Sequence, residues 1–117
     1  KNITLKIYGG DKIISENEII DCLDRSKISI CTSNIDANPR VISESMARNV
    51  PVICASDLTG GKFQINKKTG IISNPDASSF SKNILYMLNN LNNFNPKKFV
   101  NTIKDASNQI IKIMEEE

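Results

Sequence analysis

The chain contains no histidine and no tryptophan, and its acidic residues form no cluster of the kind that holds a metal ion. Without histidine it lacks the side chain that most often acts as a general acid or base near neutral pH. Its two tyrosines and four phenylalanines are too few to predict a stacking platform for single-stranded nucleic acid. We therefore expect no metal centre and no other cofactor, and any chemistry has to depend on carboxylates and backbone groups.

Long apolar runs and clustered charge are also missing. No run approaches the ~20 apolar residues of a membrane-spanning helix, and Lys1 leads directly into an alternating segment rather than a signal peptide. The 15 basic and 13 acidic residues give a formal charge of +2 and are scattered, unlike the positive stripe of a nucleic-acid-binding protein. At 117 residues the chain forms at most one domain, which we expect to be soluble and cytoplasmic.

Cysteine is scarce as well. Cys22, Cys31 and Cys54 form no Cys-x-x-Cys pair, and no histidine is present to complete a zinc site. We expect them to be reduced, buried side chains of a cytosolic protein.

Strand-like and helix-like segments alternate along the sequence. Apolar and polar residues alternate from Ile3 to Tyr8, whereas residues 50–55 are apolar throughout, as in a strand covered on both faces. The predicted strands cover residues 3–8, 28–32, 50–55 and 71–73. The predicted helices cover residues 15–26, 39–48, 76–88 and 96 to the C-terminal end, with a short helical segment at 61–66. This alternation predicts a parallel α/β sheet with helices on both faces.

The best-defined helix boundaries surround residues 39–48. Asn38 is a favourable N-cap, and Pro39 suits the first helical position. Asn49 follows the helix as a residue that tolerates left-handed backbone. Expected N-caps elsewhere are Ser15 or Asn17 and Asp76 or Ser78.

Two carboxylates flank the start of this helix. Asp36 precedes the expected cap, and Glu44 lies about a turn and a half inside the helix. The free backbone N–H groups and positive dipole end of a helix N-terminus suit an anion. Carboxylates nearby can accept hydrogen bonds from sugar hydroxyls, so the arrangement suits a phosphate-bridged ligand such as a nucleotide-sugar. Taken alone, the residues also allow Asp36 to be a helix cap and Glu44 a solvated surface residue.

The sequence around these carboxylates has further landmarks in a fixed order. These are the acidic-x7-Glu spacing of Asp36 to Glu44, Ser45-Met46-Ala47, Val50-Pro51-Val52-Ile53, Gly60-Gly61, Thr69-Gly70-Ile71-Ile72 and Pro75-Asp76. Over roughly residues 15–95 the chain thereby resembles the C-terminal, donor-binding domain of retaining GT-B glycosyltransferases, the glycosyl transferases of group 1. The resemblance implies a Rossmann-like donor-binding domain at 1–95, with a C-terminal helix at 96–117 packing on it.

The resemblance also implies which residues bind the donor, a UDP- or GDP-sugar. The donor sugar would be held by Asp36, Ala37 and Asn38, the ribose by Glu44, with Gly60 and Gly61 near the same cleft. No residue of the chain is assigned a catalytic role. Such enzymes build polysaccharides, glycolipids or glycoproteins. The resemblance places them at the inner face of the membrane, as peripheral proteins.

The resemblance further implies that part of the enzyme lies outside the chain. Only about four strands are expected, so we interpret the chain as an incomplete C-terminal lobe. The acceptor-binding N-terminal lobe and the basic pair for the donor phosphates would lie upstream, and the chain alone is expected to be inactive. Lys62 follows Gly61, and we expect it to be a solvated lysine rather than a phosphate ligand. The apolar stripe of the last helix, left without the second lobe, predicts self-association: Phe99, Ile103, Ala106, Ile110 and Ile113.

Two alternative functions remain open at this stage. A receiver-type signalling domain also carries a segment like Val50–Ile53, but it needs paired acidic residues after its first strand, where only Asp11 is present. A non-catalytic module that binds a sugar nucleotide or another protein would share the same fold without transferring sugar.

Overall fold

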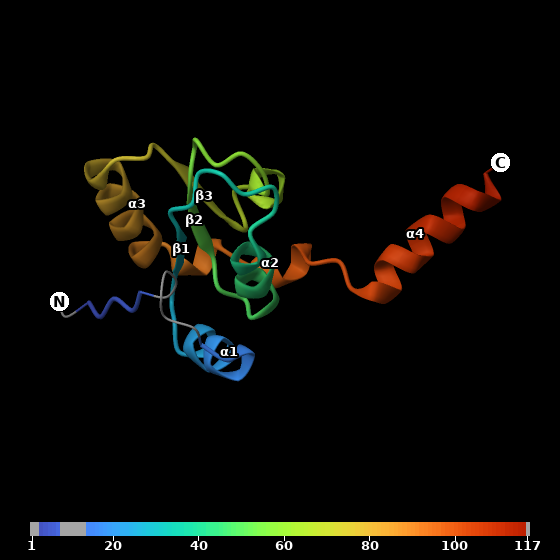
Figure 1. Ribbon diagram of the computed structural model, residues 1–117, viewed down its shortest axis with the longest axis horizontal. Helices are drawn as coiled ribbons and strands as arrows, with labels where there is room; N and C mark the ends of the chain where they lie inside the picture. Colours follow the sequence, from blue (N-terminus) through green and yellow to red (C-terminus); the bar gives the residue numbers. More distant parts are fainter. Residues whose placement is uncertain (1–2, 8–13, 117) are drawn as a thin grey trace.

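Three parallel strands form the centre of the computed structural model, which describes residues 3–7 and 14–116 (Figure 1). The strands are β1 (Ser29–Cys31), β2 (Val52–Ala55) and β3 (Gly70–Ser73), and they lie in the order β1-β2-β3. Ser29 pairs with Val52, and Val52 pairs with Gly70. Because all three strands run in the same direction, the loops that follow them emerge at one edge of the sheet.

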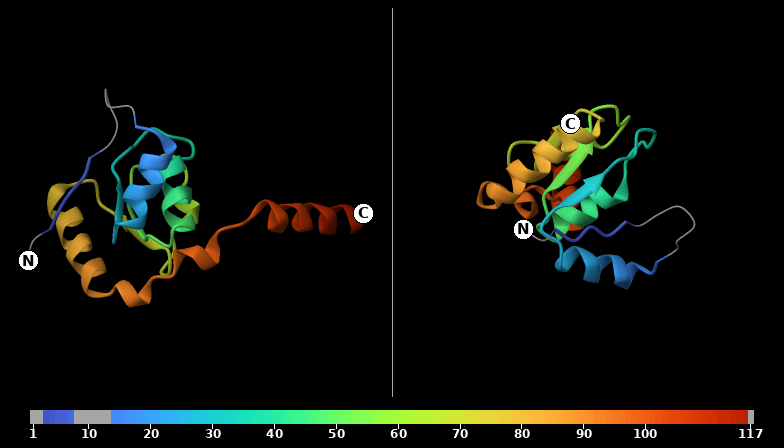
Figure 2. Two further views of the ribbon diagram at one scale, coloured as in Figure 1. Left: turned by 90° about the horizontal axis from the view of Figure 1, so that it is seen from below. Right: turned by 90° about the vertical axis from the view of Figure 1, so that its left-hand side faces the viewer.

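Helices cover both faces of this sheet, as the sequence predicts. Helix α2 (Arg40–Ala47) lies on one face and α3 (Ala77–Asn89) on the other, while α1 (Glu16–Asp24) lies beside α2 (Figures 1 and 2). Asp24 forms an ion pair with Arg48, which follows α2 and thereby ties the two helices together. This hydrogen bond from Arg48 lowers the pKa of the Asp24 carboxyl.

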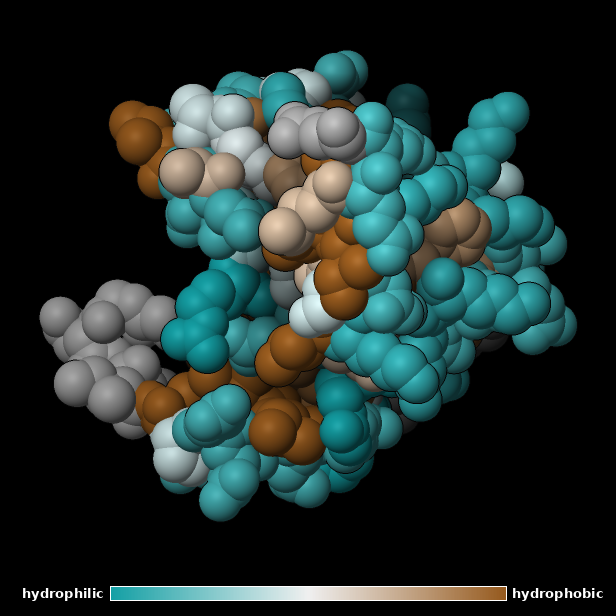
Figure 3. Space-filling view, turned by 90° about the vertical axis from the view of Figure 1, so that its right-hand side faces the viewer, coloured by the Kyte–Doolittle hydropathy of each residue, from teal (hydrophilic) through white to brown (hydrophobic). Residues whose placement is uncertain are grey.

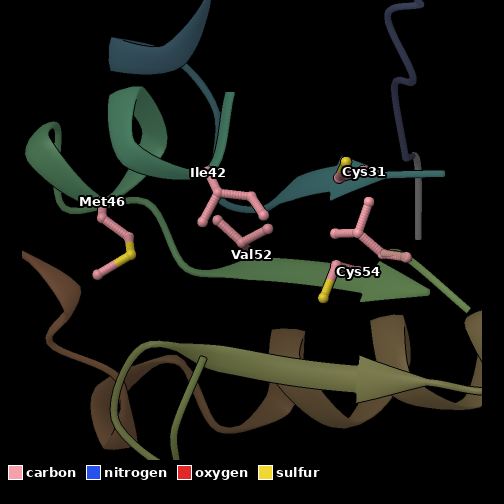
Figure 4. Close-up of a cluster of buried hydrophobic side chains, with 6 residues drawn as sticks. Cys31, Ile42, Met46, Val52 and Cys54 are labelled. Atoms are coloured by element: carbon pink, nitrogen blue, oxygen red, sulfur yellow. The ribbon is translucent and has the colours of Figure 1, made fainter. Parts of the chain in front are cut away.

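The core lies between α2 and the sheet. All four residues of β2 are buried, which confirms that this strand is covered on both faces. Ile42 and Met46 of α2 pack against Val52 and the thiols of Cys31 and Cys54 (Figure 4). Leu58, which follows β2, is also fully buried in this cluster and anchors the loop after the strand.

Several predicted helix boundaries are confirmed. The Ser15 hydroxyl accepts a hydrogen bond from the Glu18 N–H at the start of α1. The Asp76 carboxylate accepts from the Ser79 N–H at the start of α3, and this bond lowers the pKa of Asp76. Asn49 adopts the expected left-handed backbone, with φ of 62°.

The predicted first strand is wrong for the residues that the structure describes. Residues 3–7 form no strand, and Tyr8 lies outside the described residues. Ile3, Leu5 and Ile7 are all more than half exposed. An alternating pattern produces a strand only where the backbone finds a neighbouring strand and the apolar side chains find a covering face, and residues 3–7 have neither.

The cap predicted for α2 is also different. Pro39 occupies the N-cap position, and no side chain caps the helix. The Asn38 side chain instead accepts a hydrogen bond from Gln64 Nε2, at 3.2 Å. A long-range partner has therefore replaced the local capping bond that the sequence suggested.

The last predicted helix is two separate elements. A 3₁₀ segment, η3 (Pro96–Phe99), packs against α2 with Pro96 buried. Helix α4 (Ile103–Glu115) begins at a capping box in which Thr102 and Asp105 bond each other's backbone N–H. Two further 3₁₀ segments are η1 (Lys62–Gln64) and η2 (Leu91–Asn93).

Helix α4 does not pack on the domain. None of its residues is buried, and it projects away from the sheet in Figure 1 and in the left view of Figure 2. Figure 3 views the molecule from this side and shows apolar side chains exposed among hydrophilic ones. The structure thus packs η3 against α2, whereas no residue of α4 is buried. No helix in the described part of the chain is long and apolar enough to cross a membrane.

One buried polar atom in α2 has no hydrogen-bond partner among the described residues. Ser45 is fully buried, and its Oγ makes no hydrogen bond within the part of the chain that the structure describes. A buried hydroxyl without a partner costs about 1–3 kcal/mol. Ser45→Ala should therefore raise the free energy of unfolding, measured by urea denaturation, by about 1 kcal/mol or more.

Ser81→Ala is the matched control, because Ser81 is exposed in α3 and reports only the change in helix propensity. A Ser45→Ala variant less stable than the wild type would show that the hydroxyl has a partner.

Candidate functional site

Two loops meet at the carboxyl edge of the sheet. Residues 32–39 follow β1 and lead into α2, and residues 56–61 follow β2 and lead into η1. In open parallel α/β sheets, ligands bind in the crevice outside the carboxyl ends of the strands. These two loops, the 32–39 loop and the 56–61 loop, are therefore the candidate site.

Hydrogen bonds hold the two loops together. The Thr59 N–H donates to the Asn34 carbonyl at 2.8 Å. The Thr59 hydroxyl accepts from the Asp36 N–H at 3.0 Å and donates to the Asp36 carbonyl at 3.1 Å. Thr59 thus fixes the backbone of Asp36, a residue 23 positions earlier in the sequence.

Two glycines allow the loops to approach this closely. A Cβ on Gly60 would lie 1.8 Å from the Ala37 carbonyl oxygen, so no other residue fits without moving the backbone. Gly61 has φ of 83°, the left-handed region that favours glycine, and lies against Pro39 and Ile42. The glycine pair that the sequence singled out is therefore required by the geometry.

The Asp36 carboxylate has one local role and one free oxygen. Its Oδ1 accepts a hydrogen bond from the Asn38 N–H at 3.0 Å, which stabilises the turn before α2. Its Oδ2 makes no hydrogen bond to the described residues, and the side chain is exposed. The carboxylate can therefore accept hydrogen bonds from a ligand without leaving the turn.

The Asn38 and Glu44 side chains are each held by a neighbour. Asn38 accepts from Gln64, which in turn accepts from the Ser43 hydroxyl at 3.0 Å. Glu44 forms an ion pair with Arg40 one turn earlier in α2, with Nε to Oε1 at 3.5 Å. The Glu44 side chain remains 30% exposed and Arg40 85% exposed.

The structure thus brings most of the predicted site residues into direct contact. Asp36, Ala37, Asn38, Gly60 and Gly61 belong to one hydrogen-bonded and packed unit. Glu44 is further along α2, and its described polar contact is with Arg40. Sequence reasoning missed Arg40, Thr59 and Gln64. The four-residue spacing of Arg40 and Glu44 on a helix was a signal for the first of these, whereas no local pattern indicates the other two.

The thiols of Cys31 and Cys54 are buried, and buried thiols are generally unreactive. Cys31 and Cys54 face each other in the register of β1 and β2, and both are buried and free. Burial raises the pKa of the Cys54 thiol, and the neighbouring Cys31 raises it further, against the lowering effect of Lys62. The expected burial is confirmed for these two thiols, whereas Cys22 is half-buried.

The candidate site is an open surface rather than an enclosed cavity. A hollow of about 430 Å³ lies between α2, η1 and the segment after η3, and another of about 640 Å³ lies beside the start of β3. Neither is lined by Asp36, Asn38 or the glycine pair. Within residues 3–7 and 14–116, no three His, Cys, Asp or Glu side chains are grouped to hold a metal ion.

Gly60→Ala should destabilise the joined loops. The added methyl group would overlap the Ala37 carbonyl, and relieving such overlap costs about 1–3 kcal/mol. We expect the free energy of unfolding in urea to fall by that amount. Ser33→Ala in the facing loop is the control, since its exposed side chain makes no hydrogen bond to the described residues. Equal stability of the two variants would show that the loops are not in contact.

The family model described as glycosyl transferases group 1 matches residues 12–117, nearly the whole chain. No curated protein and no solved structure gives a match.

Proposed function

Because the chain belongs to the glycosyl transferases group 1 family, we propose that it is the nucleotide-sugar-binding part of a retaining, metal-independent glycosyltransferase. The reaction would transfer a sugar from UDP or GDP to a growing polysaccharide, glycolipid or glycoprotein. In the longer protein this would take place at the cytoplasmic face of the membrane.

One observation carries the proposal. The 32–39 loop and the 56–61 loop are joined at the carboxyl edge of the sheet, so that the exposed Asp36 carboxylate and the Gly60-Gly61 turn form one surface. Their backbone is fixed before any ligand binds. A preorganised surface avoids the ordering cost that binding to mobile loops would carry.

The contacts support specific roles in donor binding. The free Oδ2 of Asp36 would accept hydrogen bonds from hydroxyls of the donor sugar, beside the backbone of Ala37 and Asn38. The Glu44 carboxylate would accept the two ribose hydroxyls, with Arg40 beside it in an ion pair. Gly60 and Gly61 would keep the 56–61 loop packed against Ala37 and Pro39, and so keep the donor surface in one arrangement.

Acceptor binding requires parts beyond these residues. We propose that a separate N-terminal lobe binds the acceptor and supplies further phosphate contacts, so that this chain alone transfers no sugar. The alternative, a non-catalytic sugar-nucleotide-binding or interaction module, shares the donor surface and differs only in lacking transfer by the longer protein.

Ligand-observed NMR with UDP, GDP and their sugars tests donor binding directly. Asp36→Ala and Glu44→Ala should each weaken the preferred nucleotide-sugar about tenfold, the effect of losing one charge-assisted hydrogen bond. Asp36→Ala should spare the free nucleotide, because its partner is the sugar, whereas Glu44→Ala should weaken both.

Glu16→Ala is the control, since Glu16 is exposed at the start of α1, away from both loops. Unchanged binding in both site variants would overturn the residue assignments. A wild-type chain that binds no donor would favour the interaction module.

The exposed α4 supports the further proposal that the chain self-associates. A 13-residue helix without packing is only marginally stable in water, and Ile103, Ile110 and Ile113 are each more than half exposed. Ile110→Lys should shift the sedimentation profile towards monomer across a concentration series. Asn108→Lys adds the same charge on the polar face of α4 and should leave the profile unchanged; a monomeric wild type would contradict the proposal.

A further inference from the structure

Lys62 is not the solvated lysine that the sequence suggested. It follows the Gly60-Gly61 turn as the first residue of η1, and its side chain is half-buried. The Lys62 side chain turns back toward the 56–61 loop, so that its Nζ donates a hydrogen bond to the Ser56 carbonyl at 2.8 Å. The ammonium therefore lies against the 56–61 loop.

Two contacts locate this ammonium at the carboxyl edge of the sheet. Ser56 directly follows β2, and its N–H donates to the Ser73 carbonyl at the end of β3, which fixes its position. The charge of Lys62 also acts on the Cys54 thiol in β2, whose pKa it lowers against the larger effect of burial. The ammonium is thus held next to the end of the central strand, against the 56–61 loop.

The positive charge of Lys62 has no carboxylate partner among the residues that the structure describes. Arg25, Arg40 and Arg48 each pair with an acidic side chain, whereas the described hydrogen bonds of Lys62 amount to the Ser56 carbonyl alone. An ammonium has three N–H donors, so two remain for another acceptor. A partly desolvated cation of this kind favours an anion beside it.

We propose that Lys62 binds the diphosphate of the nucleotide-sugar donor. The inference rests on the proposed function, because that function places the sugar at Asp36 and the ribose at Glu44, and the diphosphate joins the two. Lys62 directly follows the Gly60-Gly61 turn, and its ammonium contacts the 56–61 loop at the Ser56 carbonyl. It supplies a positive charge from within this chain to the group that carries most of the ligand's negative charge.

A purely structural role for Lys62 makes a different prediction. If the hydrogen bond to Ser56 only held the 56–61 loop in place, its loss would weaken every ligand of the site equally. A diphosphate contact instead affects ligands according to their phosphate groups. Uridine, UDP and inorganic pyrophosphate separate the two roles. Uridine has the base and ribose of UDP without its diphosphate, and pyrophosphate has a diphosphate without the base and ribose.

The test is an NMR titration of the full chain with these three probes, monitored by ³¹P for the phosphates and by ¹H for uridine. We expect Lys62→Gln to weaken UDP and pyrophosphate about tenfold and to leave uridine unchanged. Lys62→Arg should restore most of the affinity, because it keeps the charge. Lys67→Gln is the matched control, since Lys67 is exposed in the turn before β3, at the opposite edge of the sheet.

The outcomes distinguish this inference from the proposed function. Equal UDP and pyrophosphate affinities in Lys62→Gln and Lys67→Gln, or equal losses for uridine and UDP, would overturn the role of Lys62. A wild type that binds nucleotide-sugars but not pyrophosphate would contradict the inference and leave the proposed function standing. Lys62-dependent binding of pyrophosphate with no added affinity for any nucleotide-sugar would instead overturn the proposed function and the donor assignment with it.

Discussion

The absence of a side chain at Gly60 is the constraint on which the candidate site depends. Only without a Cβ can the 56–61 loop lie against the Ala37 carbonyl, and only at that distance can Thr59 bond the backbone of Asp36. The buried Leu58 holds the same loop from below by packing into the core. Core packing, the glycine contact and the hydrogen bonds therefore specify a single arrangement of the two loops.

This arrangement holds polar side chains in place and leaves hydrogen-bonding atoms on them free for a ligand. Asp36 needs one carboxylate oxygen for its turn and leaves the other for a ligand. Glu44 is oriented by an exposed arginine and remains partly accessible. Lys62 is held by a backbone carbonyl rather than by a carboxylate, so its charge is not neutralised within the described residues. These groups would suit a ligand that combines hydroxyl groups with negative charge, as the proposed nucleotide-sugar donor does.

The sequence predicted those parts of the fold that local chemistry decides. The continuous apolar run of β2, the left-handed Asn49 and the caps at Ser15 and Asp76 each depend on a few neighbouring residues. The glycine pair was identified as well, although its reason, the close approach to Ala37, is visible only in three dimensions.

Predictions that needed a distant partner were less successful. The alternating segment at 3–7 has no neighbouring strand among the described residues. The Asn38 side chain, predicted to cap α2, instead accepts a hydrogen bond from Gln64. The regular apolar stripe beyond Pro96 predicted a single helix, whereas a new helix begins after the Thr102 cap. No residue of this helix, α4, is buried. Lys62 looked solvated because sequence cannot show that its ammonium folds back to Ser56. In each case the outcome was set by a tertiary contact, or by its absence.

We propose that the joined loops form one ligand-binding surface at the carboxyl edge of the sheet. A map of backbone amide chemical shifts in a ¹H–¹⁵N spectrum, recorded during titration with UDP and a UDP- or GDP-sugar, tests this. We expect the largest changes to fall together in residues 33–38 and 56–62, with the turn at 66–69 unaffected. Changes concentrated at that turn or along α4, or confined to one of the two loops, would contradict it.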